Sequence, residues 1–232
     1  GGIRMNDALH VGLMVPINNT TMERELVAWL PAGSTCTTRR IPRGKGLLTR
    51  ETLPAYKAQA LSLAQAFDAP DIDVVAYGCT AAGFISGPAG DAALQAELAA
   101  VTGKSVVTTA RSMVVALQAI GAQRIALVTP YLEAVNTQLK AFIADGGIAV
   151  KRFDSFYAQN TDELGRITAA QVASLARATM DDECDVLFIG CSQLPTFEIL
   201  ADLEREFGRP ALSSIQVTAR CVREAATRGV AA

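Results

Sequence analysis

Two cysteines of this 232-residue chain lie in matching sequence contexts. Cys79 belongs to Asp73-Val-Val-Ala-Tyr-Gly-Cys-Thr80, and Cys191 belongs to Asp185-Val-Leu-Phe-Ile-Gly-Cys-Ser192, 112 positions further along the chain. In both segments an apolar run typical of a buried strand ends in glycine, cysteine and a hydroxyl residue. Backbone N–H groups and a helix N-terminus at such a place lower the pKa of a thiol. We therefore expect a pair of reactive cysteines.

The other three cysteines carry no such signal. Cys36, Cys184 and Cys221 lie outside any repeated motif, no pair has the C-x-x-C spacing of a zinc or redox site, and the total of five is odd. A free cysteine is most often a small buried apolar residue, and we assign that role to these three. The same role is the competing interpretation for Cys79 and Cys191.

The single histidine, His10, restricts the chemistry further. It speaks against a Ser-His-Asp or Cys-His hydrolase and against a histidine-rich metal site. No G-x-G-x-x-G follows the first apolar run, where Pro16-Ile-Asn-Asn stands, and none of the five lysines lies in a strand-end motif. We expect neither a metal nor a nicotinamide or pyridoxal cofactor.

The composition indicates a compact globular protein. Half of the residues are apolar, and 21 Lys and Arg against 23 Asp and Glu leave a formal net charge of -2. This balance offers no broad electrostatic attraction for nucleic acid or an anionic membrane. No apolar run approaches the ~20 residues of a membrane span, and no leader-like segment is recognisable. With reduced thiols, we expect a cytoplasmic location.

Short apolar runs alternate with amphipathic segments in the first half of the chain. The pattern predicts strands over Val11–Pro16, Ser34–Ile41, Asp73–Tyr77 and Val106–Thr108. Helical spacing of apolar residues predicts helices over Met22–Leu30, from Leu53 to Phe67, from Leu94 to Val101 and from Met113 to Ile120. Strands that alternate with helices are typical of a parallel sheet.

The second half repeats this order. Strands are predicted over Ile125–Pro130, Gly147–Phe153 and Asp185–Ile189, and helices from Leu132 to Phe142, from Val172 to Thr179 and from Ile199 to Phe207. Pro16 and Pro130 end the first strand of each half, an offset of 114 positions that is close to the offset of the two cysteines. A period this long indicates a duplicated domain, since solenoid repeats run to about 20–50 residues.

We therefore predict an α/β protein with two similar parallel-sheet lobes related by a pseudo-twofold axis. The expected lobes are residues 5–110 and 111–214, and the sequence leaves open whether a C-terminal helix over 215–228 completes the first lobe. Ligands bind outside the carboxyl ends of parallel strands. Cys79 and Cys191 would then face each other across the cleft between the lobes.

The turns after the strands supply further polar groups. Asn19 follows the first strand, Tyr131 holds the matching place in the second half, and Asn160 lies in a later loop. Each has a competing structural interpretation. Asn19 would cap the next helix, Tyr131 would be a buried ring with a polar tip, and Asn160 would belong to a plain turn.

Hydroxyl groups stand directly beside the cysteines. Thr80 and Ser192 add donors to the backbone N–H groups, and neither cysteine motif contains Lys or Arg. Together these neutral donors suit carboxylate groups. The basic, glycine-containing stretch around 42–48 is either a solvated loop or a lid.

These motifs resemble the aspartate/glutamate racemase superfamily, and within it the branch of maleate cis-trans isomerases and arylmalonate decarboxylases. The resemblance runs from about Val11 to Ala225 and is carried by Pro-x-x-Asn-Thr-Thr-Met-Glu23, Val-x-Pro-Tyr131 and Cys191-Ser-Gln-Leu-Pro-Thr196. It implies two flavodoxin-like lobes, no cofactor, a small carboxylate as substrate, and a homodimer or higher homo-oligomer.

The resemblance also implies residue roles. Cys79 and Cys191 match the two active cysteines of the superfamily, and Asn19, Tyr131 and Asn160 match groups that bind the carboxylates of the substrate. Arylmalonate decarboxylases keep the second cysteine but have glycine where Cys79 stands. The chain departs from the isomerases at position 18, where asparagine replaces a frequent serine, and in the segment 80–84.

The leading hypothesis is a cofactor-independent isomerase that converts maleate into fumarate. Cys79 would add to the alkene, and Cys191 would handle the proton at the opposite face. A two-cysteine racemase of an amino acid, hydantoin or related acid needs the same pair and remains the alternative, with an arylmalonate-type decarboxylase third. The non-enzymatic alternative is a small-ligand sensor, whose thiols would keep a pKa near ~8.5.

Overall fold

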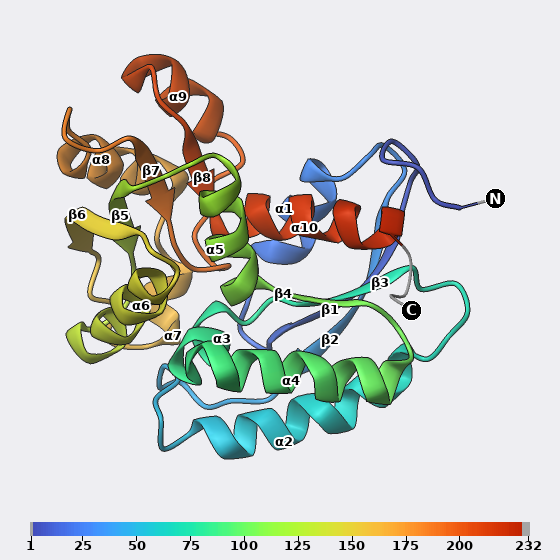
Figure 1. Ribbon diagram of the computed structural model, residues 1–232. Helices are drawn as coiled ribbons and strands as arrows, with labels where there is room; N and C mark the ends of the chain where they lie inside the picture. The colour runs from blue at the N-terminus through green and yellow to red at the C-terminus, as the bar shows by residue number, and fades with distance from the viewer. Residues whose placement is uncertain (1, 229–232) are drawn as a thin grey trace.

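Two parallel four-stranded sheets organise residues 2–228, which the computed structural model describes (Figure 1). The first sheet has the order β2-β1-β3-β4, with β1 at His10–Pro16, β2 at Thr35–Ile41, β3 at Val74–Tyr77 and β4 at Val106–Thr108. The second has the order β6-β5-β7-β8, with β5 at Arg124–Thr129, β6 at Ala149–Ser155, β7 at Val186–Ile189 and β8 at Ala211–Ser213. The repeated topology confirms the predicted two-lobe α/β fold.

Three short elements were not predicted from the sequence. They are β8, the helix α3 (Thr80–Ile85) that follows Cys79, and the helix α7 (Thr161–Gly165). The two helices have at most 6 residues, which is too short for a helical period to show, and β8 (Ala-Leu-Ser) lacks the paired valines that marked the equally short Val106–Thr108. Of the three, α3 matters for the site, because it begins directly at the Cys79 motif.

The central strands explain the apolar runs. Every residue of β3 and β7 is buried, as expected for parallel strands with both faces covered by helices. The edge strands β2 and β6 are partly exposed and correspondingly more polar. Both cysteine motifs therefore follow central strands of their sheets.

Helices cover both faces of the first sheet (Figure 1). One face carries α1 (Met22–Trp29) and the C-terminal helix α10 (Ser214–Arg228), which pack against Val11, Leu13 and Val15 of β1. The other face carries α2 (Leu53–Ala64), extended by the 3-10 turn η1 (Gln65–Phe67), and α4 (Gly87–Thr102). The chain thus returns to the first sheet after it has completed the second.

The remaining helices pack on and between the sheets. They are α5 (Thr109–Ala119), which lies against α10, α6 (Glu133–Asp145), α8 (Ala169–Thr179) and α9 (Leu200–Phe207). One apolar cluster includes Tyr77 of β3, Leu127 of β5 and Phe188 of β7, so a continuous core runs through both sheets. Lobe boundaries at 5–110 and 111–214 stay a prediction. No helix within residues 2–228 has the length and apolar character to cross a bilayer.

Candidate active site

Cys79 lies just beyond β3, at the residue that precedes α3. The glycine before it is required by packing: Gly78 donates its backbone N–H to Met14 O at 2.7 Å, and a Cβ on Gly78 would collide with Met22 Sδ. The Cys79 side chain is buried, and the hydroxyl oxygen of Tyr56 on α2 lies 2.6 Å from its Sγ. A polar phenol therefore contacts this thiol directly.

Cys191 adopts a backbone conformation that is unusual for a residue with a side chain. Its φ is 99°, its backbone N–H donates to Ser214 Oγ at 2.9 Å, and its Sγ accepts the backbone N–H of Gln193 at 3.4 Å. Such strain costs about 1–3 kcal/mol and is found mainly at functional sites. Cys184, in contrast, is buried without such strain, in keeping with a structural role.

One small cavity, of about 40 Å³, lies between the two halves and is lined by both thiols. The space holds a few waters or one small ligand. A larger surface hollow of about 530 Å³ beside α4, α5 and α10 touches neither thiol. The lining of the small cavity consists of Pro16, Asn19, Arg43, Leu47, Leu48, Cys79, Thr80, Ala81, Tyr131, Val135, Leu164, Cys191, Ser192 and Gln193.

Four of the five residues predicted to bind substrate lie at this cavity. Asn19, Thr80, Tyr131 and Ser192 line it, whereas Asn160 does not. Asn160 precedes α7, and its Oδ1 accepts the backbone N–H of Glu163 at 2.9 Å, which is a helix cap. Asn160 therefore has a structural role in this conformation, but as a helix cap and not in the plain turn that was the competing interpretation.

Asn19 and Ser192 connect the two halves at the floor of the site. Asn19 Oδ1 accepts the backbone N–H groups of Thr21 and Met22 at 3.1 and 2.9 Å, and its Nδ2 donates to Ser192 Oγ at 3.3 Å. Ser192 Oγ donates in turn to the carbonyl oxygen of Gly78 at 2.7 Å. Asn19 thus stabilises the start of α1 and also contacts the residue after Cys191.

Two hydroxyl groups at the cavity lack partners among the described residues. Thr80 Oγ1 and Tyr131 Oη are both buried, and neither has a partner at normal hydrogen-bond geometry within residues 2–228, although the Tyr131 hydroxyl lies near enough to Cys191 and Thr80 for their polar atoms to affect its pKa. A buried polar group without a partner costs about 1–3 kcal/mol. The Tyr131 ring is held edge-on by Phe84 of α3, with the ring centroids 5.4 Å apart. Both hydroxyls are therefore ready to bind a polar ligand.

The expectation of low thiol pKa values is wrong for this site. Burial raises the pKa of Cys79 to about 12, although hydrogen bonding by Tyr56 and the charge of Arg43 act in the opposite direction. Burial likewise raises the pKa of Cys191, against the backbone N–H of Gln193 and the Tyr131 hydroxyl. Desolvation of the thiolate outweighs the backbone dipoles that the sequence suggested. Both thiols are protonated at neutral pH.

Comparison with known proteins identifies the family of this chain. The family model described as arylmalonate decarboxylase matches residues 12–231. The chain belongs to this family. The maleate isomerase of Nocardia farcinica (strain IFM 10152) is 32% identical over 216 residues, which are 88% of this chain and 84% of the relative. The arylmalonate decarboxylase of Bordetella bronchiseptica is 27% identical over 173 residues, which are 74% of this chain and 72% of the relative.

A solved structure agrees with the fold of this arylmalonate decarboxylase family member. It is a cysteine-to-serine mutant of the Nocardia farcinica maleate cis-trans isomerase with a covalently bound succinylcysteine intermediate. The two align with a TM-score of 0.83 and 27% identity, over 94% of this chain and 93% of the other. The family resemblance that the motifs predicted is confirmed.

Sequence reasoning missed several residues of this family member's site. Tyr56 was placed only within the helix predicted from Leu53 to Phe67, and Arg43 only within the basic stretch that was interpreted as a solvated loop or a lid. Leu47 and Leu48 show that the 42–48 loop borders the cavity. Gln193 stood inside the quoted cysteine motif, which was a usable signal; the other residues are distant from both motifs in the sequence.

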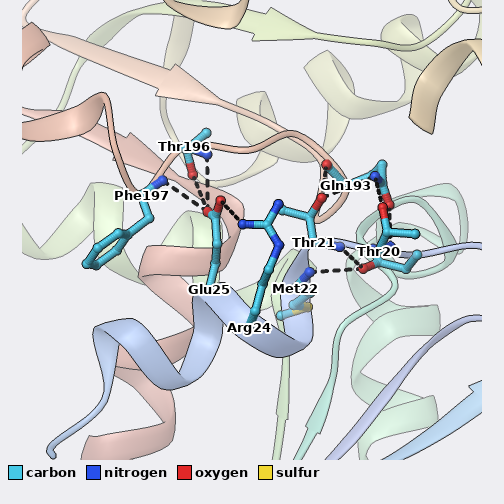
Figure 2. Close-up of polar contacts among 9 residues, drawn as sticks. Thr20, Thr21, Met22, Arg24, Glu25, Gln193, Thr196 and Phe197 are labelled. Atoms are coloured by element: carbon cyan, nitrogen blue, oxygen red, sulfur yellow. Dashed lines mark hydrogen bonds and ion pairs between the residues drawn. The ribbon is translucent and has the colours of Figure 1, made fainter. Parts of the chain in front are cut away.

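Gln193 is bonded to the loop that precedes α1 (Figure 2). Its Oε1 accepts the backbone N–H of Thr20 at 2.8 Å, and its Nε2 donates to Thr20 Oγ1 at 2.8 Å. Thr21 Oγ1 donates to the carbonyl oxygen of Gln193 at 2.7 Å. The segment beside Cys191 is thereby attached to the half of the molecule that carries Cys79.

A buried carboxylate makes a second connection nearby (Figure 2). Glu25 Oε1, on α1, accepts the backbone N–H groups of Thr196 and Phe197 at 3.1 and 3.0 Å. Glu25 is only 3% exposed, so these bonds are shielded from water. The loop from Cys191 to Phe197 is consequently held at two places against α1 of the first sheet.

Proposed function

We propose that this protein is a cofactor-independent isomerase that converts maleate into fumarate through covalent addition of Cys79. The observation that supports this most directly is the small cavity that is lined by one cysteine from each half. Two thiols at one ligand supply the nucleophile and the acid that addition to an alkene requires. The sequence similarity to the Nocardia farcinica maleate isomerase supports the choice of substrate.

The reaction begins with the fraction of Cys79 that has lost its proton to the solvent, and this thiolate forms a C–S bond to one alkene carbon of maleate. The electron pair of the double bond then takes the proton of the Cys191 thiol at the other carbon, which leaves a succinyl adduct and a Cys191 thiolate. Rotation about the new C–C single bond is easy. Removal of the proton by Cys191 and cleavage of the C–S bond release fumarate and restore both cysteines.

Neutral donors stabilise the charge that develops during addition. The electron density moves into the carboxylate next to the carbon that receives the proton. The unpartnered hydroxyls of Thr80 and Tyr131 and the Asn19 side chain lie where they can bind that group. Asn160 stays a proposed carboxylate ligand, through the amide nitrogen that its capping bond leaves unused.

A relative supplies the chemical precedent. The Nocardia farcinica maleate cis-trans isomerase holds a succinylcysteine intermediate when one of its cysteines is replaced by serine. We expect the same species here on Cys79. An arylmalonate-type decarboxylation is less well supported, because the resemblance associates it with glycine at position 79.

The decisive test is proton NMR of the purified protein with maleate. Fumarate should form with the wild type and should not form with Cys79→Ser. Cys191→Ser should stop turnover and accumulate a protein adduct heavier by one maleic acid, located at Cys79 by peptide mass spectrometry. An adduct on neither cysteine, together with no fumarate, would contradict the proposal.

The racemase alternative uses the same two thiols and is tested in parallel. One thiolate would remove an α-proton from an amino acid, hydantoin or related acid while the opposite thiol delivers another. Solvent deuterium would then enter the α-position of such a substrate. Ligand binding with neither fumarate formation nor exchange would favour the sensor.

Location and assembly are further proposals. All five cysteines are free, which suits a reducing compartment such as the cytoplasm. We also expect a homodimer or higher homo-oligomer, as the family resemblance implies. Light scattering coupled to size-exclusion chromatography measures the oligomeric mass directly.

A further inference from the structure

Arg43 brings a positive charge to a cavity whose motifs suggested neutral donors only. It lies on the loop after β2, is half-buried, and lines the cavity together with Cys79 and Cys191. Its Nε donates to Asn18 Oδ1 at 2.7 Å. This bond orients the guanidinium and leaves its two terminal nitrogens for another acceptor.

No carboxylate within residues 2–228 forms an ion pair with Arg43. Its basic neighbours differ in this respect. Arg40 Nη2 lies 2.7 Å from Glu23 Oε2, and Lys45 Nζ lies 3.3 Å from Asp162 Oδ2. A partly desolvated guanidinium without a counter-charge is unfavourable, so the cavity favours an anion as its occupant.

The charge of Arg43 acts on the groups around the cavity. Burial raises the pKa values of Cys79, Cys191 and Tyr131, and in all three cases Arg43 lowers them. Arg43 and these three residues all line the same small cavity, which explains why one charge acts on all of them. A ligand in contact with both thiols is therefore within reach of the guanidinium.

We propose that Arg43 selects a dianionic ligand by binding the carboxylate remote from Thr80 and Tyr131. The identity of that ligand as maleate rests on the proposed function. Neutral hydroxyls hold one end, where charge develops during the reaction, while Arg43 neutralises the permanent charge at the other end. The planar guanidinium matches a carboxylate with two parallel hydrogen bonds, which lysine cannot provide.

Asn18 belongs to the same proposed carboxylate-binding site. Its Oδ1 is the one hydrogen-bond acceptor that Arg43 has among residues 2–228. Related isomerases frequently have serine at this position, and serine is too short to hold the guanidinium in the same way. The departure from the isomerase pattern at Asn18 thus coincides with an arginine that needs an orienting partner.

The test compares succinate with succinamate, which has the same shape but one negative charge fewer. Isothermal titration calorimetry should show that the wild type binds succinate at least about 10-fold more tightly. Arg43→Gln should weaken succinate binding about 10- to 100-fold, the range of a charge-assisted hydrogen bond, and change succinamate binding less than about 3-fold. Arg50→Gln, which removes an exposed arginine of the same segment, is the matched control and should behave as wild type.

Two further variants separate charge from geometry. Arg43→Lys keeps the charge and should recover part of the succinate preference, and Asn18→Ala should weaken succinate binding about 3- to 10-fold by freeing the guanidinium. Unchanged succinate affinity in Arg43→Gln, or equal affinities of the wild type for both ligands, would overturn the inference. Calorimetry needs no turnover, so a protein that binds succinate through Arg43 but makes no fumarate would refute the proposed function alone.

Discussion

The Glu25 carboxylate accepts the backbone N–H of Thr196 at 3.1 Å, and this bond joins helix α1 of the first sheet to the loop that carries Cys191. A second bond from the same oxygen reaches the N–H of Phe197 at 3.0 Å. Neither bond touches the cavity. Their effect on the reaction must therefore pass through the position of the Cys191 loop, which makes Glu25 a positioning residue.

Replacement of Glu25 by alanine should lower both stability and turnover. Glu25→Ala leaves two backbone donors without their acceptor, so we expect a loss of about 2 kcal/mol in the free energy of unfolding and about a 10-fold fall in kcat. Glu25→Gln retains an acceptor oxygen and should recover most of kcat, with KM little changed in both variants. Chemical denaturation and steady-state kinetics measure the two effects.

Arg24→Ala is the matched control for Glu25. Arg24 lies 3.7 Å from Glu25 Oε2 but is largely exposed, so its removal should change stability by less than about 1 kcal/mol and leave kcat near wild type. Glu25→Ala with wild-type kcat would show that the loop needs no such support.

The contact between Tyr56 and Cys79 gives a second prediction. The hydroxyl of Tyr56 lowers the pKa of Cys79 against the larger effect of burial. Tyr56→Phe removes this hydrogen bond and raises the pKa of Cys79 further. Since a rise of about one pKa unit lowers the thiolate fraction about 10-fold, kcat/KM for maleate at a fixed pH should fall by about the same factor. Tyr157→Phe, at an exposed tyrosine outside the cavity, serves as control. An unchanged kcat/KM in Tyr56→Phe would mean that the hydroxyl does not stabilise the attacking form.

The pH dependence of the reaction follows from the raised pKa of Cys79. With a pKa of about 12, the thiolate fraction grows tenfold with each pH unit at neutral and mildly alkaline pH. Because kcat/KM reports the ionisation of the free enzyme, its logarithm should rise with a slope near one between about pH 7 and 9. Initial rates across this range, with the fold checked by circular dichroism, test the expectation. A plateau beginning near pH 7 would contradict a buried, protonated nucleophile.

The sequence carried enough information for the fold and for the reactive pair. Cys79 and Cys191 could be recognised because a duplicated fold places two similar strand-end motifs 112 positions apart. The seven predicted strands were long or apolar enough to show a pattern. The strand β8 has only 3 residues, and its pairing with β7 is a tertiary contact that a local sequence pattern does not predict.

The chemistry of the cavity was less accessible from the sequence. Arg43 and Tyr56 lie on a loop and a helix far from both cysteine motifs, and only packing brings them to the thiols. The prediction of low pKa values for Cys79 and Cys191 was wrong for the same reason, because desolvation of a thiolate depends on how completely the folded chain excludes water from Sγ. Asn160 was assigned to a plain turn, because α7, the helix that it caps, has only 5 residues and was not predicted.

A buried acid behind α3 gives the last prediction. Asp91 on α4 is 2% exposed; one carboxylate oxygen accepts the Thr108 hydroxyl at 2.7 Å, and Oδ1 has no hydrogen-bond partner within residues 2–228. Burial raises the pKa of Asp91 from 3.8 to about 6, more than the Thr108 bond lowers it. The carboxylate is therefore charged at neutral pH in a place that disfavours charge.

The sign of the pH effect on stability follows from this raised pKa. Because the folded-state pKa of Asp91 lies above the unfolded value, protonated Asp91 favours the folded state, and this contribution is fully present below about pH 4. It is lost as the pH rises through about 6, and the free energy of unfolding then falls by up to about 3 kcal/mol. Asp91→Asn removes the charge and keeps an acceptor for Thr108, so we expect it to be about 1–2 kcal/mol more stable than wild type at pH 7. The advantage should vanish near pH 4.

Urea denaturation of the wild type, Asp91→Asn and Asp68→Asn at pH 4, 5.5 and 7 measures this difference. Asp68 is exposed, so its variant should follow the wild type at every pH. A variant Asp91→Asn that is less stable than wild type at pH 7 would mean that the carboxylate has a compensating partner, such as a buried water. In that case its charge would support the packing of α4 beneath the Cys79 helix instead of opposing it.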